Sequence, residues 1–154
     1  MRTSLQSGLE IRAAHQDDAS AISELLTELG HPLEPALART QIDRIRALAP
    51  NYAIFVAVRA GTVIGLVSAF STPVLHRAQP VGRVSVLVVA GPHAGQGIGS
   101  ALLRHAEEFL AELGCGRIEL TSASHREAAH DFYLARGYVK QGGKSTRESP
   151  EQGS

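Results

Sequence analysis

Residues 83–103, RVSVLVVAGPHAGQGIGSALL, decide how the rest of the chain can be interpreted. The first part, Arg83–Ala90, is almost wholly apolar, which is typical of a central strand covered on both faces. A turn with glycine at positions 95, 97 and 99 follows, and it leads into an apolar pattern of helical period. Glycine lets the backbone approach a ligand closely, and the first N–H groups of a helix attract anions. The stretch therefore predicts a strand, a phosphate-binding turn and a helix.

Other phosphate-binding motifs, and a plain connection without a ligand, compete for this interpretation. Gly95, Gly97 and Ser100, with Glu119 about 20 positions further on, nearly satisfy the dinucleotide-binding fingerprint. However, a hairpin precedes the turn, where a dinucleotide-binding fold requires a parallel repeat. Residues 142–145, GGKS, resemble the end of a P-loop, but the motif's first glycine is absent and no room remains for its helix.

The segments before this stretch alternate between helical and strand periodicity. An aspartate, Asp17 or Asp18, can cap a first helix through its carboxylate. In a second helix we expect four apolar side chains to face inward: Leu37, Ile42, Ile45 and Leu48. The predicted elements are a strand at Leu9–Arg12, a helix ending at Gly30, a helix at Pro35–Ala49, a hairpin of strands Tyr52–Arg59 and Val63–Ser71, and a loop at Thr72–Gly82.

The segments after it continue the same mixture. The helix after the glycine turn ends at Gly114 or Gly116. The predicted elements that follow are a strand at Arg117–Ser122, a helix at His125–Arg136, and two short strands at Tyr138–Gln141 and Lys144–Glu148. Helices and strands do not alternate regularly, so the fold class is a mixed α/β domain of the α+β kind.

Length and composition favour one small globular domain. The chain has 154 residues, which suits a single core, with 15 basic and 15 acidic side chains. This balance gives no support to binding of nucleic acid or of an anionic membrane surface. We expect a flexible leader at residues 1–8, the domain at residues 9–148, and a disordered tail at residues 149–154.

The number of cysteines and the hydropathy of the chain indicate the cellular compartment in which the protein is expected. The single cysteine, Cys115, cannot form an internal disulfide, and its position between two glycines favours a buried small hydrophobe over a nucleophile. No apolar run approaches the roughly 20 residues that span a bilayer, and residues 1–10 lack the apolar core of a signal peptide. We therefore expect a cytoplasmic protein.

Two segments of the sequence resemble the GNAT family of N-acetyltransferases. Leu87-Val88-Val89, followed by residues 96–103, QGIGSALL, looks like the family's cofactor segment. Residues 119–122, ELTS, with Arg126, Ala129-His130, Phe132-Tyr133 and Gly137-Tyr138, resemble its second cofactor-contacting segment. The resemblance implies the acyl-CoA N-acyltransferase fold, a mostly antiparallel central sheet of six to seven strands flanked by about four helices. It also implies acetyl-CoA as the cosubstrate.

The resemblance assigns cofactor contacts to particular residues. By analogy the main chain of Leu87, Val88 and Val89 contacts the pantetheine arm, and an N–H near Val89 stabilises the oxyanion. The pyrophosphate would lie on the residues of the turn, which are Ala94, Gly95, Gln96, Gly97, Ile98, Gly99 and Ser100. The family usually has Arg or Gln where this chain has Ala94, so one side-chain anchor is missing.

A second group of expected site residues comes from the later segment. Tyr133 matches the family's general acid, since a phenol with a pKa near 10 can protonate a thiolate leaving group. The alternative is that Tyr133 is a helix core residue. Arg126 can contact the cofactor or cap its helix, and Phe132 can contact the cofactor or pack in the core.

The general base is not evident from the sequence. Many relatives carry a glutamate on the strand before the turn, where this chain has Arg83, Ser85 and Val89. The candidates are a water held by Ser85 and backbone groups, or His76 from the preceding loop. His125 and His130 lie five residues apart, on different faces of one helix, so we expect no metal site.

The acceptor is expected to be a small-molecule amine, because the later segment looks most like enzymes of the aminoalkylphosphonate and aminoglycoside types. Arg77 or Arg83 could then receive an anionic group of the substrate. Acetylation of proteins or peptides, and a non-catalytic acyl-CoA sensor, remain alternatives. Relatives are often dimers, so a homodimer also stays open.

Overall fold

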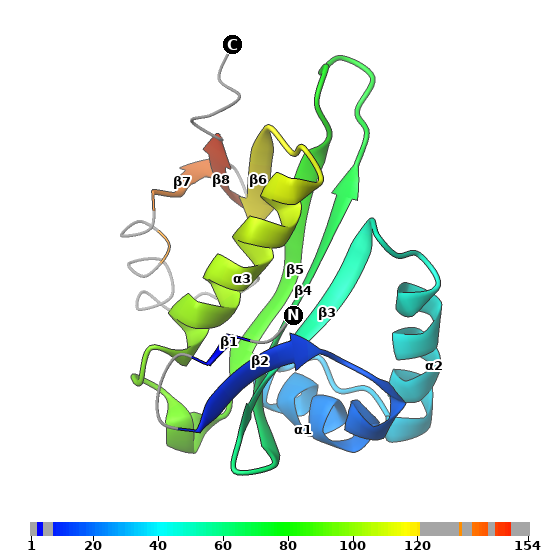
Figure 1. The fold of residues 1–154 in the computed structure, drawn as a ribbon, viewed down its shortest axis with the longest axis vertical. Coiled ribbons are helices and arrows are strands. Elements are labelled where there is room, and N and C mark those ends of the chain that lie inside the picture. The colour runs from blue at the N-terminus through cyan, green and yellow to red at the C-terminus, as the bar shows by residue number, and fades with distance from the viewer. Residues whose placement is uncertain (1–2, 5–7, 121–132, 134–136, 142–143, 149–154) are drawn as a thin grey trace.

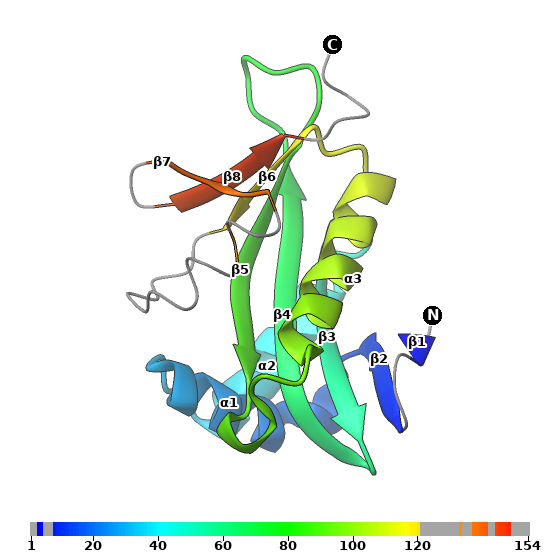
Figure 2. The same ribbon diagram turned by 90° about the vertical axis from the view of Figure 1, so that its left-hand side faces the viewer.

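The computed structural model describes residues 3–4, 8–120, 133, 137–141 and 144–148, which form one sheet with helices on both faces (Figures 1 and 2). The strands are β1 (Thr3–Ser4), β2 (Leu9–Ala13), β3 (Tyr52–Arg59), β4 (Thr62–Thr72), β5 (Val81–Val89), β6 (Arg117–Leu120), β7 (Val139–Gln141) and β8 (Lys144–Glu148). The helices are α1 (Ala19–Leu29), α2 (Pro35–Arg46) and α3 (Ile98–Glu112), with short 3₁₀ turns η1 (Gln16–Asp18) and η2 (Gly91–His93).

The sheet has the order β1-β2-β3-β4-β5-β6-β8-β7, and β5–β6 is its parallel pair among antiparallel neighbours. The predicted mixed α/β fold is confirmed, and each of the seven expected strands is present. The eighth, β1, pairs with β2 inside the segment that sequence analysis treats as a flexible leader. Of the expected helix at residues 125–136, only Tyr133 belongs to the described residues.

Helix α3 covers one face of the sheet, and α1 and α2 lie against one end of the other face (Figure 2). Two glycines allow α3 to approach closely. A Cβ built on Gly82 would lie 2.8 Å from Leu110 Cδ1, and one on Gly65 would lie 3.0 Å from Leu102 Cδ1. The α3 core contains Leu102, Leu103 and Leu110, and the core under α1 and α2 contains Ile22, Leu25 and Ile42 among others.

A β-bulge in β5 changes which side chains face each core. Ser68 pairs with Val86 while Ala69 pairs with Val84, so Ser85 is an extra residue on β5. Val84 belongs to the α3 core, but Val86 packs against the core under α1 and α2. In a regular strand these two side chains would share a face, because side chains alternate with a period of two. The bulge therefore lets one apolar strand supply both cores.

The structure corrects the predicted inward face of α2. Leu37 and Leu48 are exposed, with relative accessibilities of 47% and 55%, whereas Ala38 and Ile42 are each 1% exposed. The buried positions follow a helical spacing that starts at residue 38, one residue after Leu37. Leu48 lies beyond the last helical residue, Arg46, because α2 is shorter than the sequence suggests.

The predicted capping role of the aspartates is also wrong. Asp18 occupies the N-cap position of α1, but its side chain does not cap that helix. Instead its carboxylate accepts two hydrogen bonds from Arg12, at 2.8 and 2.9 Å, and one from the His15 N–H at 2.9 Å. Burial opposes ionisation, but the Arg12 guanidinium and the His15 N–H hold the pKa of Asp18 below its ordinary value. This pair joins β2 to the start of α1.

We predict that Asp18→Asn lowers the free energy of unfolding by about 1–3 kcal/mol at pH 7, because a buried, charge-assisted pair is lost. A depressed native pKa stabilises the fold above the unfolded pKa, and this contribution disappears as pH falls through the native pKa. Urea titrations at pH 7 and at decreasing acid pH should therefore show the gap to wild type closing. Asp17→Asn, at a side chain that is 85% exposed, is the control. A gap that persists unchanged in acid would contradict this account.

Candidate active site

The glycine turn lies between the end of β5 and the start of α3. Gly95 and Gly97 have φ values of 78° and 81°, a left-handed conformation that side chains with a Cβ rarely adopt. A Cβ built on either would meet nothing within 4 Å, so the space above the turn is open. Gly97 is the N-cap of α3, and Gly99, the third expected glycine of the turn, is already helical. The N–H groups of the first turn of α3 have no acceptor within their own helix, so they fit a phosphate-type anion.

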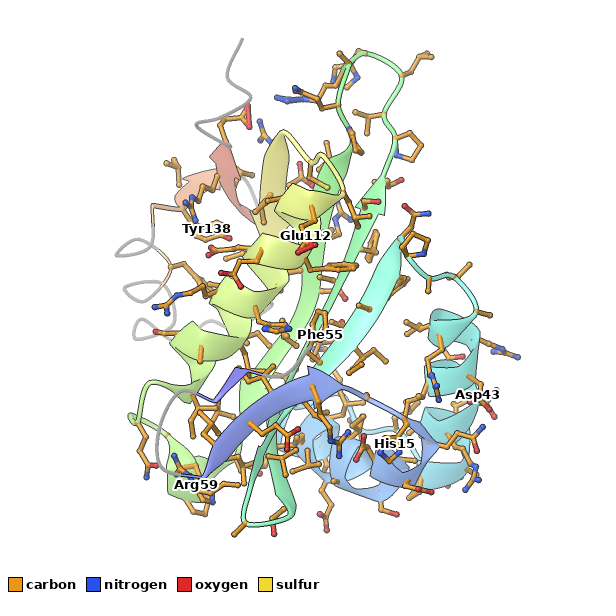
Figure 3. The ribbon with its side chains drawn as sticks, viewed as in Figure 1. His15, Asp43, Phe55, Arg59, Glu112 and Tyr138 are labelled. Carbon is orange, nitrogen blue, oxygen red and sulfur yellow. The ribbon has the colours of Figure 1, made fainter. Side chains whose placement is uncertain are left out.

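A cation reaches this turn from a distant part of the chain. Arg59, at the end of β3, donates from Nη1 to Gln96 Oε1 at 2.6 Å, and Figure 3 shows its side chain beside the turn. Ala94 offers no polar side chain there. Arg59 is therefore a site residue that sequence analysis missed, because the two residues are 37 positions apart and no motif relates them.

Near the turn, one edge of β5 has no paired strand among the described residues. The Ala90 N–H donates to the Ile64 carbonyl of β4 at 2.8 Å. Hydrogen-bonding directions alternate along a strand, so the backbone groups of Val88 also face β4, whereas those of Leu87 and Val89 face the opposite edge. Within the described residues, pairing with β6 on that edge covers Val81–Val84. The two residues expected to contact the cofactor through their main chain are therefore oriented away from β4.

The bulged residue places a hydroxyl pair on the sheet face opposite α3. Ser85 Oγ lies 2.7 Å from Ser68 Oγ on β4, and Ser68 is buried. Each hydroxyl can both donate and accept, so the pair can also hold a water or a polar substrate atom. This arrangement is compatible with the expected water held by Ser85.

A carboxylate lies beside β5 although none is encoded on that strand. Glu119 of β6 pairs in register with Arg83, and its Oε1 accepts from Arg83 Nη2 at 2.8 Å. The Glu119 side chain is 9% exposed, and Arg117 Nε lies 3.4 Å from its other oxygen. Parallel pairing of β5 with β6 thus places the carboxylate of Glu119 beside β5, a strand whose own sequence has no acidic residue.

Tyr133 lies in the core on the α3 side, with a relative accessibility of 6%. Its ring centroid is 6.3 Å from that of Tyr138, and its carbonyl accepts from the Tyr138 N–H at 3.0 Å. The Tyr138 hydroxyl donates to Glu107 of α3 at 2.8 Å. Tyr133 therefore has a packing role in addition to any chemical one. The other two candidates of this segment, Arg126 and Phe132, lie outside the described residues.

His76 is exposed in the loop between β4 and β5, at the opposite end of β5 from the glycine turn (Figure 1). The nine residues of β5, at about 3.3 Å each, separate the loop from the turn by roughly 25–30 Å. The structure therefore does not bring His76 to the main chain of Leu87 and Val89. Ser85, which pairs with Ser68, is therefore the polar side chain of β5 that is nearest in sequence to Leu87 and Val89.

Cys115 and the side chains that could bind a metal ion show no sign of chemistry in the described residues. Cys115 is 2% exposed, and burial raises the pKa of its thiol to about 11, so it is the buried small residue that the sequence predicts. Among the residues that the structure describes, no cluster of three His, Cys, Asp or Glu side chains could hold a metal ion. Within the same part of the chain, no helix is long and apolar enough to cross a membrane.

Comparisons with known proteins agree with this geometry. Residues 19–138 match the acetyltransferase (GNAT) family. An aminoalkylphosphonate N-acetyltransferase from Salmonella typhimurium is 36% identical over 129 residues, which is 84% of each chain. A crystal structure of a transcriptional regulator from Bacillus halodurans has a TM-score of 0.78 and 25% identity, over 87% of this chain and 96% of that one.

A third comparison concerns the fold alone. A chain in the crystal structure of the NatC complex bound to a Gag peptide and CoA has a TM-score of 0.77 at 18% identity, covering 93% of this chain and 99% of that one. The match to the family covers well over half of the sequence and includes the strand, the glycine turn and α3. The chain is an acetyltransferase of the GNAT family, which uses acetyl-CoA as its acetyl donor.

Proposed function

We propose that this enzyme acetylates the primary amine of a small molecule by direct attack in a ternary complex with acetyl-CoA. The observation that carries the proposal is the open glycine turn at the end of β5, next to the strand edge formed by Leu87 and Val89. The relative from Salmonella typhimurium, named as an aminoalkylphosphonate N-acetyltransferase, supports a small acceptor over a protein.

The described residues fit acetyl-CoA, which supplies an activated acetyl thioester when bound. Its pyrophosphate would lie on the N–H groups from Gly95 to Ser100, and a Cβ added at Gly95 or Gly97 would meet nothing within 4 Å. Arg59 would supply the positive charge that Ala94 does not. The main chain of Leu87 and Val89, which faces away from β4, would hold the pantetheine arm, whereas the backbone groups of Val88 face β4.

The chemical steps would use groups on both sides of that edge. The Val89 N–H stabilises the developing oxyanion, since a fixed backbone dipole needs no reorganisation. A water on the Ser68–Ser85 hydroxyl pair accepts the proton of the acceptor ammonium. The amine nitrogen bonds to the carbonyl carbon and the carbon–sulfur bond breaks, and the Tyr133 phenol donates its proton to the departing sulfur. The second proton that the nitrogen loses restores the phenol.

Release of free thiol, measured with acetyl-CoA and panels of small amines and of peptides, tests the proposal directly. We expect turnover with small primary amines that exceeds hydrolysis by at least tenfold, and no such gain with peptides. Turnover with peptides alone would assign the enzyme to protein acetylation. Tight CoA binding without turnover on any acceptor would favour a sensor and would contradict the proposal.

We predict that Gly97→Asp weakens CoA binding at least tenfold, because it places a Cβ and a negative charge where the pyrophosphate would lie. Gly114→Asp is a matched control, since Gly114 also has a left-handed φ, 84°, and open space around a built Cβ, but lies after α3. Backbone strain is comparable in the two variants. Calorimetric titration with CoA should separate them. Equal affinities for the two variants would place the cofactor elsewhere.

We predict that Tyr133→Phe lowers kcat at least tenfold with little change in CoA affinity. The substitution keeps the buried ring and removes only the hydroxyl, so it separates a chemical role from a packing role. Tyr138→Phe is the control: it removes the hydrogen bond to Glu107 and should lower the melting temperature while kcat changes less than twofold. Unchanged kcat in Tyr133→Phe would reduce Tyr133 to a core residue.

A further inference from the structure

Arg83 lies on the sheet face opposite α3, near the junction of β5 with β6. Its neighbour Gly82 faces Leu110 of α3, so the Arg83 side chain projects to the other face. There it stands opposite Phe70 of β4, whose ring packs against Tyr52 with centroids 4.8 Å apart. α1 and α2 lie at the other end of this face, near the end of β5 (Figure 2).

The Arg83 guanidinium is fixed in position but incompletely paired. It donates from Nη2 to Glu119, and within the described part of the chain this is the one hydrogen bond that its five N–H donors make. Its Nε is buried without a hydrogen-bond partner, while the side chain as a whole is 39% exposed. Burying an unpaired donor is unfavourable, and a purely structural ion pair does not require it. Arg83 therefore keeps donors that could bind an oxyanion.

The charges around Arg83 favour an anion as well. Arg117 lies 3.4 Å from Glu119 and 3.8 Å from Glu148, and Arg77 Nη2 lies 2.9 Å from Glu148. Among the described residues, three guanidinium groups thus lie around two carboxylates. Because Glu119 is nearly buried, its bond to Arg83 is screened less by solvent than a surface pair would be. Glu119 therefore orients Arg83 without neutralising the whole cluster.

Arg83 is also suitably placed along β5. The strand presents, in order, the Arg83 guanidinium, the Ser85 hydroxyl and the outward-facing main chain of Leu87. The Cα atoms of residues 83 and 87 lie about 13 Å apart or less, since a bulge shortens the strand. The long Arg83 side chain spans part of this separation. A short aliphatic molecule with an anionic group at one end and an amine at the other would span the rest, from the guanidinium to the main chain of Leu87.

We propose that Arg83 binds an anionic group, a phosphonate or a carboxylate, on the acceptor amine, and that Glu119 is the positioning residue for its guanidinium. This inference rests on the proposed acetylation of small amines. The guanidinium offers planar, paired donors to an oxyanion, which distinguishes it from a lysine at the same place. The acceptor class is thereby narrowed to short amines that carry an anionic terminus.

The test compares three acceptors of similar length: 2-aminoethylphosphonate, 3-aminopropanoate and the neutral 3-aminopropan-1-ol. For the wild type we expect kcat/KM for at least one anionic amine to exceed that for the neutral amine by tenfold or more. Arg83→Met should remove this preference through KM, with a loss of at least tenfold for the anionic amine and less than twofold for the neutral one. The relative values for the two anionic amines distinguish phosphonate from carboxylate.

Two further variants test the roles assigned to Arg83 and Glu119. Arg83→Lys keeps the charge but not the planar donors, so it should retain an intermediate preference. Glu119→Gln should raise KM for the anionic amine severalfold and leave kcat within twofold, because the arginine loses its orienting partner. Arg44→Met, at an exposed arginine of α2 bonded to Gln41, is the charge-matched control and should change nothing. Thermal unfolding verifies that each variant is folded.

The possible failures are distinguishable. Equal wild-type activity on all three amines would overturn the anion site while the proposed function stands. An equal loss on all three amines in Arg83→Met and Arg83→Lys would make Arg83 a structural residue. If the wild type acetylates no amine, the proposed function fails, and calorimetric titration with methylphosphonate then tests the site separately. Binding to the wild type that is tenfold weaker in Arg83→Met supports the site, and equal or absent binding overturns it.

Discussion

One extra residue in β5 determines how the two halves of this fold meet. Ser85 opposes no residue of β4, and the bulge that it forms reverses which side chains face α3. Before the bulge Val84 packs under α3, and after it Leu87 and Val89 do so, while Val86 and Val88 turn to α1 and α2. A regular strand would place Val84, Val86 and Val88 on one face. The bulge also orients Ser85 toward Ser68 on the face opposite α3.

The same strand can combine a structural role with the proposed chemical one, because the proposed chemistry uses its main chain. The backbone groups of Leu87 and Val89 point away from β4, and the glycine turn presents N–H groups at the start of α3. Backbone groups place few demands on side-chain identity, so the apolar side chains of β5 can be selected for core packing. Arg59 brings a side-chain cation to the glycine turn from a neighbouring hairpin, close to position 94, where the side chain is apolar.

Polar side chains on the other face of the sheet depend on pairing between β5 and β6. Glu119 reaches Arg83 because the two strands run parallel in register, and Arg117 joins them from the same strand as Glu119. Arginines lie against both oxygens of this carboxylate, so its position suits it to orient a cation. The Ser68–Ser85 hydroxyl pair lies on the same face of the sheet.

The sequence by itself determined the order of the described elements from β2 onward, the strand–turn–helix unit around Gly97, the burial of Cys115 and the membership of the family. These features follow from local periodicity, turn chemistry and contiguous motifs. Ile42 of α2 is buried as predicted, but the inward placement of Leu37 and Leu48 and the capping of α1 by an aspartate were wrong, because competing partners in the fold decide them. The bulge at Ser85, the Arg59–Gln96 contact and the Arg83–Glu119 pair were decided only by the tertiary structure. Each of these features depends on strand register or on contacts between residues at least 17 positions apart. A local sequence pattern predicts neither the register nor such contacts.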